Sequence, residues 1–399
     1  MFDYIKIEGF RSFKKVELEM PRLAVLIGPN GGGKSNFVDL LMLMAEAGRG
    51  RFSNGVSKRN GFLNIAFGFD PSQEVRVELR FKEALHPWKV TLDGGDEKLD
   101  VRFRVSAQNY GFIARITEEL VRQESTKRPS LCADMVSRGP AGAVFRATNE
   151  AGEVVAEEHR GVNFAELVIS DVKDPVKYPA ASVVLKELEG WTFYRDIDVG
   201  PESRVRQPSL IREGIQLLPD GTNLSSVLHE IQQKYPDAWD EILEILKTAY
   251  PDFLKLSVPA GGGDGNVHLR WFEHPYEKLG LTANLLSDGT LKLLCLIAIL
   301  KSPNPPPLIC IDEPELGLHP DWIELVAELL QDAAVRTQVI VATHSPHIVA
   351  KLDPDQVIVT EKENGETRLE RLSSSDLEKW LRDFNLADLW LAGHIGGRP

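Results

Sequence analysis

Apolar and polar residues alternate over the first twenty positions of the chain and then give way to a continuous apolar run. The stretch YIKIEGFRSFKKVELEM (residues 4–20) has the period of two that half-buried strands show. The next stretch, LAVLIGPNGGGKSNFVDLLMLMAEA (residues 23–47), places an apolar run before a glycine-rich turn and a longer apolar-rich segment after it. The pattern therefore predicts half-buried strands, a buried strand, a tight turn and a long helix, in this order.

The periodicity of the apolar residues changes twice in the middle of the chain. Short alternating runs recur between residues 61 and 172, which predicts mostly antiparallel β-structure with a hairpin turn at NEAG (residues 149–152). From Gly221 apolar residues fall three and four positions apart, as they do in amphipathic helices. Past Leu279 helical segments alternate with short apolar runs, and this alternation predicts a parallel sheet covered by helices.

Two further elements are predicted near the end of the chain. ENGE (residues 363–366) has the composition of a hairpin turn. The segment SDLEKWLRDFNLADLWLAG (residues 375–393) has the periodicity of an amphipathic helix.

Composition and charge limit the class of protein. Of the 399 residues, 43% are hydrophobic and 26% are charged, an ordinary balance for a globular protein. No stretch approaches the roughly 20 apolar residues of a membrane span, and the first residues do not resemble a signal peptide. We therefore expect a cytoplasmic protein with no membrane partner. The net charge of −13 disfavours nucleic-acid binding by the whole surface but leaves room for a local basic patch.

The three cysteines are Cys132, Cys295 and Cys310. They are far apart and none belongs to a C-x-x-C pair, so the sequence indicates neither a zinc site nor a disulfide framework. Cys295 and Cys310 lie in apolar runs, where we expect them to be core residues.

The glycine-rich turn has the pattern of a phosphate-binding loop. GPNGGGKS fits G-x-x-x-x-G-K-[ST], with Gly28, Gly33, Lys34 and Ser35 at the defining positions. Glycines allow backbone N–H groups to converge on phosphate oxygens, and the start of a helix adds positive potential. Lys34 is then expected to contact the β- and γ-phosphates, and Ser35 to hold Mg²⁺. A glycine-rich turn without function is the alternative, which the flanking strand and helix disfavour.

A second strand ends in two adjacent acids. In ICIDEPELGLHP (residues 309–320) an apolar run leads into Asp312 and Glu313, and buried carboxylates are costly unless they are paired or bound to metal. A nucleotide site needs an Asp at a strand end to serve Mg²⁺, which fits Asp312. Glu313 is then expected to polarise the attacking water. Pro314 indicates that the strand ends here; an exposed acidic pair is the alternative.

Two further motifs are weaker indications of a nucleotide site. LSDGT places Ser287 and Gly289 at the start of a helix, which is a potential anion site and, taken alone, only a good helix cap. ATHSP places His344 at the end of an apolar strand, where a lone histidine is more often structural.

Taken together, these motifs resemble the ABC-type ATPases of the RecF/SMC branch. GPNGGGKS resembles Walker A, LSDGT the signature motif, ICIDE Walker B with its catalytic glutamate, PELGLHP the D-loop region and ATHSP the histidine switch. More narrowly, DEPELGLHP resembles the stand-alone ATPases called AAA-21 or RecF-like. The chain departs from transporter subunits in Thr290, which replaces the usual glutamine, and it has candidates for the family's Q-loop glutamine, by residue type only, in Gln73 and Gln108.

This resemblance implies a fold, a set of ligands and a set of site residues. The fold is α/β: a P-loop ABC-type ATPase head with a mixed sheet, an antiparallel β extension and a helical insert. The expected domains are residues 1–195 with Walker A, a helical insert over 196–278, and residues 279–399 with the signature, Walker B and the histidine switch. The ligands are ATP and Mg²⁺. The implied residues are Glu313, His344 and Lys34 for catalysis; Gly28, Asn30, Gly31, Gly32, Gly33, Lys34, Ser35, Asn36, Ser287 and Gly289 for the nucleotide; and Ser35 and Asp312 for the metal.

The resemblance also implies partners. These are a second copy of the chain in a homodimer, DNA, and a nuclease or other effector protein, with roles in DNA repair, DNA maintenance or defence against foreign DNA. Two alternatives are the ATPase subunit of a transporter and a nucleotide-gated switch with little turnover. The β-rich insertion argues against the first, and Glu313 argues against the second. Only 55 residues follow His344, too few for the fused nuclease of OLD-type proteins.

One stretch is a candidate DNA contact. GRGRFSNGVSKRNG (residues 48–61) contains Arg49, Arg51, Lys58 and Arg59 and no acid. It is the best local basic footprint in an acidic chain. A solvated loop with chance charges is the equally weighted alternative.

Overall fold

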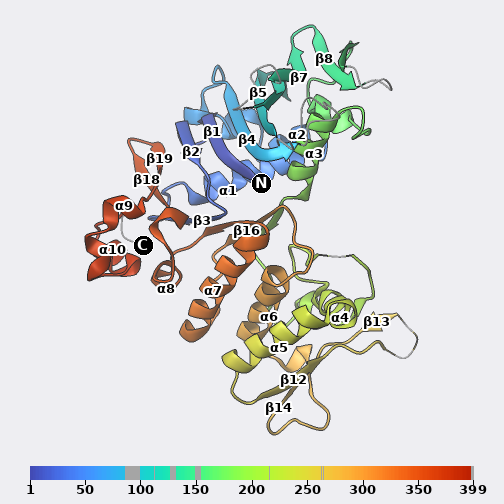
Figure 1. Cartoon of the computed structure of the whole chain (residues 1–399), viewed down its shortest axis with the longest axis vertical. Helices are drawn as coiled ribbons and strands as arrows, with labels where there is room; N and C mark the ends of the chain where they lie inside the picture. Colours follow the sequence, from blue (N-terminus) through green and yellow to red (C-terminus); the bar gives the residue numbers. More distant parts are fainter. Residues whose placement is uncertain are drawn as a thin grey trace, which may run out of the picture. The chain divides into compact units, whose positions relative to one another are not determined.

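The computed structural model describes residues 1–85, 99–111, 113–125, 132–148, 154–214, 216–261, 263 and 265–396. The chain forms two compact units, each assembled from separate stretches of sequence (Figure 1). Unit 1 contains Met1–Arg22, Ile27–Trp191 and Ile358–Leu372. Unit 2 contains Leu23–Leu26, Thr192–Val357 and Ser373–Pro399.

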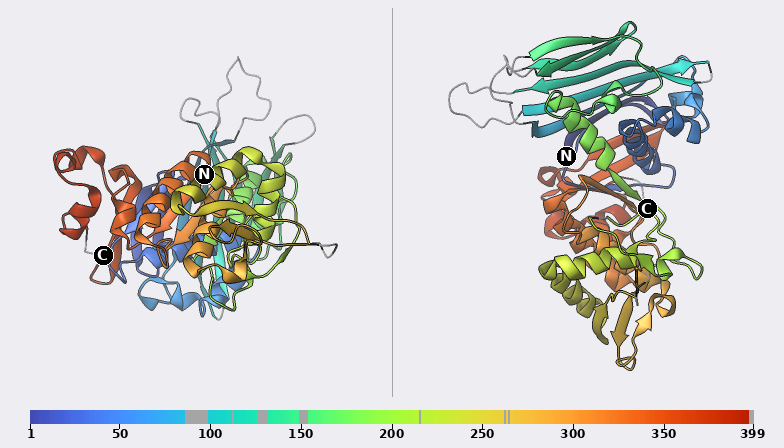
Figure 2. Two further views of the ribbon diagram at one scale, coloured as in Figure 1. Left: turned by 90° about the horizontal axis from the view of Figure 1, so that it is seen from below. Right: turned by 90° about the vertical axis from the view of Figure 1, so that its right-hand side faces the viewer.

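Unit 1 is built on an antiparallel sheet with the strand order β2-β1-β4-β5-β6-β7-β8-β9 (Figure 2). Alternation sets its two faces: in β1, Ile5 and Ile7 are fully buried, while Lys6 and Glu8, the residues that follow each of them, are not. The antiparallel structure predicted for residues 61–172 is confirmed, whereas the turn predicted at residues 149–152 lies outside the described residues. The strands are β1 Phe2–Phe10, β2 Phe13–Glu19, β4 Val75–Leu85, β5 Leu99–Tyr110, β6 Ile113–Glu124, β7 Ala133–Gly139, β8 Gly142–Thr148 and β9 Val154–His159.

Three helices and a hairpin complete unit 1. Helix α3 lies across the sheet and contacts β4 to β7, and α1 packs against α2 and α3. The approach of α1 to α3 needs a glycine, because a Cβ on Gly48 would lie 2.6 Å from the Cβ of Leu188. The predicted ENGE turn is confirmed: Asn364 and Gly365 both have positive φ and join β18 to β19. The bounds are α1 Lys34–Gly48, α2 Phe52–Lys58, α3 Pro179–Gly190, β18 Val357–Glu363 and β19 Glu366–Arg371.

The core of unit 2 is parallel, with the strand order β10-β16-β17-β3. All five residues of β3 and of β17 are buried, as expected of strands covered on both faces. Helix α6 is buried from Thr290 to Leu300 and packs against α7, which also contacts β17. The predicted β/α alternation is therefore confirmed. The bounds are β3 Leu23–Ile27, β10 Thr192–Tyr194, β16 Leu308–Asp312, β17 Gln338–Ala342, α6 Asp288–Leu300 and α7 Pro320–Arg336.

The rest of unit 2 is a helical pair with small sheets beside it. The helices predicted after Gly221 are confirmed as α4 Leu224–Lys234 and α5 Pro236–Ala249. A three-stranded sheet has the order β12-β14-β15, and β11 pairs with β13. The bounds are β11 Ser209–Leu210, β12 Phe253–Ser257, β13 Asn266–Val267, β14 Arg270–Glu273 and β15 Leu281–Thr282.

The C-terminal segment differs from its prediction. Residues 375–393 do not form one amphipathic helix, because Asn385 starts a new one: its side chain accepts from the Asp388 N–H, and Asp388 bonds back to the Asn385 N–H. The helices here are the short α8 Pro346–Val349, α9 Ser374–Leu377 and α10 Leu386–Leu391. In the described part of the chain no helix is long and apolar enough to cross a membrane.

Candidate functional site

The predicted phosphate loop in unit 1 requires its glycines for steric reasons. Gly28 and Gly33 have φ of 141° and 116°, values that favour glycine. A Cβ on Gly28 would lie 2.1 Å from the carbonyl oxygen of Thr360, and one on Gly33 would lie 2.5 Å from the side chain of Thr367. The loop therefore packs closely against β18 and β19, and this packing fixes its path.

The loop ends at the N-terminus of α1, beside Lys34. The Lys34 side chain is largely buried, and its Nζ donates to the carbonyl oxygens of Gly28 (2.7 Å) and Pro29 (3.2 Å). No side chain caps this helix end, and its first turn contains no acid. Backbone N–H groups and an ammonium group thus meet at one point, which is the chemistry that binds an anion.

A network of polar side chains supports the loop from behind. Asn36, predicted to bind the nucleotide, donates from Nδ2 to Ser12 Oγ (2.7 Å) and accepts from Arg11 Nη1 (3.2 Å). The Thr367 hydroxyl donates to Ser12 Oγ (2.8 Å) or to the Gly32 carbonyl oxygen (3.1 Å). Sequence reasoning missed Ser12 and Thr367, although Ser12 lies in the quoted FRSF opening. The loop residues Asn30, Gly31 and Ser35 are exposed.

In unit 2 the other predicted catalytic residues lie at one edge of the parallel sheet. Asp312, the last residue of β16, pairs with Ala342, and the Glu313 N–H donates to the Ala342 carbonyl oxygen (2.8 Å). His344 follows β17 by two residues. Because parallel strands end at the same edge, Asp312, Glu313 and His344 leave the sheet together. The strand ends where Pro314 predicted it would.

The backbone of Glu313 is unusual. Its φ is 49°, in the left-handed region that residues other than glycine rarely adopt. Such conformations cost roughly 1–3 kcal/mol and cluster at functional sites. The turn at Glu313 also breaks the strand alternation, so the two adjacent acids need not face opposite sides of the sheet.

Two side chains that the sequence analysis did not identify contact the residues at this edge of the sheet. Glu315 Oε1 accepts from Thr343 Oγ1 (2.6 Å) and from the His344 N–H (2.8 Å), so one carboxylate joins the loops after β16 and β17. Arg195 Nε lies 3.4 Å from Asp312 Oδ2. A second acid in DEPEL was the available signal for Glu315, while no local signal pointed to Arg195.

The LSDGT residues form the start of α6. Ser287 is the N-cap, and its Oγ accepts from the Thr290 N–H (3.1 Å) and lies 2.7 Å from Thr290 Oγ1. The Thr290 hydroxyl also bonds to the hydroxyl of Tyr250. A Cβ on Gly289 would lie 3.0 Å from the Gly317 carbonyl oxygen, so this position also favours glycine. Tyr250 is a third residue that sequence reasoning missed.

The oxygen groups present fit Mg²⁺. Among the described residues, no group of three or more His, Cys, Asp or Glu side chains could hold a metal by itself. Mg²⁺ is usually held by one or two protein oxygens together with substrate phosphates. In unit 1, the hydroxyl of Ser35 is exposed at the start of α1, and in unit 2, Asp312 places a carboxylate at a strand end. Each residue by itself offers an oxygen of the kind that Mg²⁺ prefers.

Part of the basic stretch 48–61 is committed to internal contacts, so fewer of its charges are available to DNA than the sequence suggested, while DNA binding by the stretch stays a prediction. Arg59 is buried and pairs with Asp39 (2.9 Å) and Glu46 (2.6 Å). Arg49 donates to the carbonyl oxygens of Glu189 and Trp191. Lys58 is exposed and pairs with Glu46 at 3.1 Å. The sequence could not show these acids, because they lie on α1 rather than within the stretch.

The cysteine expectation is confirmed for two residues. Cys295 and Cys310 are buried in the core of unit 2, and all three cysteines are free thiols. Burial raises the pKa of the Cys295 thiol to about 12, so it stays neutral at physiological pH.

The parallel core, the glycine loop before α1 and the acids at the strand edge define a class of fold: the chain has the α/β fold of a P-loop ATPase head of the ABC/SMC type. A family model described as "AAA domain, putative AbiEii toxin, Type IV TA system" (AAA_21) matches residues 23–350. The match covers most of the chain, so the protein belongs to the AAA_21 family.

Solved structures support the fold. A structure titled "Crystal structure of the SmcHead bound to the C-winged helix domain of ScpA" aligns with a TM-score of 0.57 and 16% identity, covering 94% of this chain and 99% of that one. An Smc head of Pyrococcus furiosus bound to the C-terminal domain of ScpA aligns with a TM-score of 0.53 and 14% identity, over 96% and 98% of the two chains. At these identities the likeness concerns the fold alone.

One curated relative matches over a short segment. The chromosome partition protein Smc of Methanocaldococcus jannaschii is 36% identical over 64 residues. This segment is 14% of the present chain and 6% of that protein. The chain therefore spans only a small part of this relative.

Proposed function

We propose that the protein binds ATP at the phosphate loop of unit 1 and hydrolyses it as a Mg²⁺-dependent homodimer. In this proposal hydrolysis drives work on DNA, in repair, maintenance or defence against foreign DNA, together with a partner effector protein. The observation that carries the proposal is the loop itself: its glycines are required by packing, and Lys34 lies beside an uncapped helix N-terminus. Membership of an ATPase family supports the same activity.

Each side chain then has a defined task. Lys34 and the amides of α1 hold the phosphates and compensate their charge. Ser35 and Asp312 would hold Mg²⁺, which when bound neutralises charge on the β- and γ-phosphate oxygens. Glu313 accepts a proton from the attacking water, and His344 orients the γ-phosphate end of the site.

A partner protein is proposed by analogy only. The two similar Smc heads were solved bound to domains of ScpA. Among the described residues no helix is longer than α7, which has 17 residues, so a head of this fold is expected to act through a separate effector rather than through its own coiled coil.

The test separates chemistry from binding. Glu313→Gln keeps the size and hydrogen bonding of the side chain but cannot accept a proton, so turnover is expected to fall by about 10²- to 10⁴-fold while ATP affinity is retained. Lys34→Ala is expected to weaken ATP binding itself. Steady-state phosphate release and a fluorescent-ATP titration measure the two effects.

Glu361→Gln serves as the control, since Glu361 is an exposed carboxylate on β18. The proposal fails if Glu313→Gln hydrolyses ATP at the wild-type rate, or if Lys34→Ala binds ATP as tightly as the wild type does.

A further inference from the structure

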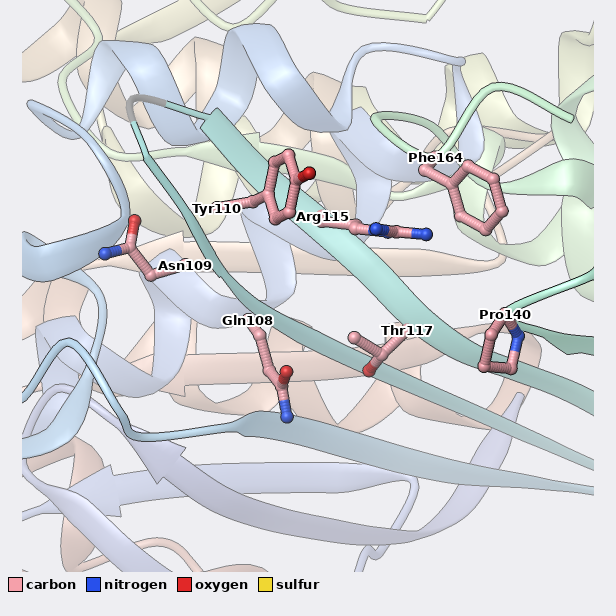
Figure 3. A pocket seen from close by; sticks show the side chains of 7 residues that line it. All are labelled: Gln108, Asn109, Tyr110, Arg115, Thr117, Pro140 and Phe164. Carbon is pink, nitrogen blue, oxygen red and sulfur yellow. The ribbon is translucent and has the colours of Figure 1, made fainter.

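A cavity of about 310 Å³ lies beside the β5–β6 hairpin of unit 1 (Figure 3). Its volume is at the lower end of the range of small-ligand sites. Its described lining residues supply two aromatic rings, one guanidinium, two amides and a hydroxyl, and no acid is among them. The lining residues are Gln108, Asn109, Tyr110, Arg115, Thr117, Pro140 and Phe164.

A β-bulge shapes one wall of the cavity. Ser106 pairs with Glu118 and Ala107 pairs with Ile116, so Thr117 is the extra residue on β6. Bulges of this kind re-aim side chains and are frequent beside functional sites. The bulge therefore sets the directions of Thr117 and of its neighbours on the same strand.

The opposite wall is held rigidly. The Ile116 N–H donates to the Phe164 carbonyl oxygen (2.8 Å), which ties the loop after β9 to the bulge. Buried Arg138 donates to the carbonyl oxygens of Asn163 (2.8 Å) and Glu166 (2.6 Å), on either side of Phe164. Phe164 is thus positioned before any ligand arrives, which lowers the ordering cost of binding.

Arg115 lies between the two rings (Figure 3). Its guanidinium carbon is 4.4 Å from the centre of the Phe164 ring and 5.3 Å from that of Tyr110. Within the described part of the chain, no carboxylate forms an ion pair with Arg115. Most other arginines of this sheet are paired, such as Arg76 with Glu74 and Arg104 with Glu118. Arg115 therefore provides an uncompensated positive charge in a strongly acidic protein.

We infer that this cavity binds one unpaired nucleotide of a single-stranded nucleic acid. The Arg115 guanidinium would contact the phosphate, and the exposed ring of Tyr110, with 62% of its surface accessible, would stack on the base. The amide of Gln108, which also lines the cavity, provides a donor and an acceptor for the edge of the base. An acidic peptide could use Arg115 but would leave the aromatic face of Tyr110 and the Gln108 amide without a role.

This inference rests on the proposed function and locates a contact with the nucleic-acid partner. The inference can fail while the proposed ATP hydrolysis holds. The experiment is fluorescence anisotropy of the full chain with a 5′-labelled oligo(dT), in the absence of ATP. Tyr110→Ala is expected to weaken binding about 5- to 150-fold, the range typical for loss of one base–aromatic stack. Arg115→Gln is expected to weaken it as well and to lower the slope of log K against log salt by about 0.7.

Two surface variants are matched controls. Arg160→Gln removes an exposed arginine from the same unit, and Tyr276→Ala removes an exposed tyrosine from unit 2. Both are expected to bind as the wild type does. Retention of the basal ATPase rate by Tyr110→Ala shows that the variant is folded and separates this inference from the proposed hydrolysis.

Several outcomes overturn the inference. They are no binding of oligo(dT) by the wild type, equal weakening in the controls, and full competition by poly-glutamate. Binding of free dTMP as tight as that of oligo(dT) would also overturn it, because the ligand would then be a small nucleotide rather than a strand.

Discussion

At the scale of single residues, Arg195 is the cation placed beside the proposed metal ligand. Its Nε lies 3.4 Å from Asp312 Oδ2, and both side chains are partly exposed. An exposed ion pair of this kind is typically worth about 0.2–1 kcal/mol. A metal that binds Asp312 has to compete with that pair.

We therefore expect Arg195→Gln to lower the Mg²⁺ concentration that gives half-maximal ATPase activity, by about 1.4- to 5-fold. A Mg²⁺ titration of phosphate release measures it. Arg204→Gln, an exposed arginine nearby in sequence, is the control and should leave the midpoint unchanged. A higher Mg²⁺ requirement in Arg195→Gln would instead mean that Arg195 assists the phosphates.

Glu119 makes stability depend on pH. It is fully buried, accepts from the N–H groups of Val168 (2.7 Å) and Ile169 (3.0 Å), and pairs with Arg138 at 3.4 Å. Burial outweighs these donors and raises the pKa of Glu119 from 4.5 to about 6. The folded state then holds more protons than the unfolded state between these two values. The contribution of Glu119 is therefore greatest below pH 4.5 and is lost as pH rises through about 6.

Urea unfolding between pH 4.5 and 6.5 can isolate this contribution. Glu119→Gln removes the titration, so its stability deficit relative to wild type is expected to shrink by about 1.5 kcal/mol as pH rises through the window. Glu118→Gln is the matched control, since Glu118 is partly exposed and pairs with Arg104. A deficit that is constant with pH would show that Glu119 keeps an ordinary pKa.

At the scale of elements, Tyr250 links the end of α5 to the start of α6. Its hydroxyl bonds to Thr290, whose hydroxyl lies 2.7 Å from the capping Ser287. Its ring packs against Trp271 and Trp322. The position of the LSDGT residues therefore depends on a tyrosine about 40 residues earlier in the chain.

Tyr250→Phe is expected to lower stability by about 1 kcal/mol, the usual value of a lost hydrogen bond, and also to lower ATP turnover. Tyr235 lies at the other end of α5, and its hydroxyl accepts from Asn304 on the surface. Tyr235→Phe is thus the matched control, and it should change neither quantity. Equal turnover in the two variants would remove the link between Tyr250 and activity.

The order of elements could be predicted from the sequence because periodicity reports burial directly. The apolar runs gave β3, β16 and β17, and the alternating runs gave the antiparallel sheet. The prediction of one helix over residues 375–393 was wrong, because the helix cap at Asn385 outweighs a helical periodicity that continues on both sides of it. Glycine spacing located the tight turn before α1, since its steric requirement is local.

Long-range contacts could not be predicted in this way. The acids that neutralise Arg59, the carboxylate that fixes His344 and the arginine beside Asp312 all come from distant parts of the sequence. A single sequence contains no record of such pairing. The cavity around Arg115 could not be predicted for the same reason, because the aromatic rings of Tyr110 and Phe164 that line it belong to β5 and to the loop after β9.

At the scale of the whole molecule, the chain contains one phosphate loop and one LSDGT motif. In the proposed homodimer each nucleotide is held by Lys34 of one chain and is reached by Ser287 and Gly289 of the second. A two-fold axis then gives two equal sites. Because the nucleotide contacts both chains only in the closed dimer, specific activity is expected to rise with protein concentration.

Mixing two inactive variants tests this arrangement. Lys34→Ala and Ser287→Arg chains each form dimers with two damaged sites, whereas a mixed dimer contains both defects in one site and leaves the other intact. Random pairing at equal amounts gives up to about a quarter of wild-type activity if the sites are independent. The shared site is ruled out if Ser287→Arg is fully active as a demonstrated monomer.

The two hydrogen bonds that Glu315 accepts from Thr343 and His344 have a consequence for how opening of this edge can be observed. The backbone proton of His344 points at a carboxylate on a different loop, so it can exchange with solvent deuterium only when the two loops separate. The protection factor of the His344 amide therefore reports how often the two loops separate, and it can be measured in the absence of ATP hydrolysis. If nucleotide binding tightens the edge, the exchange of this one amide slows before any product has formed.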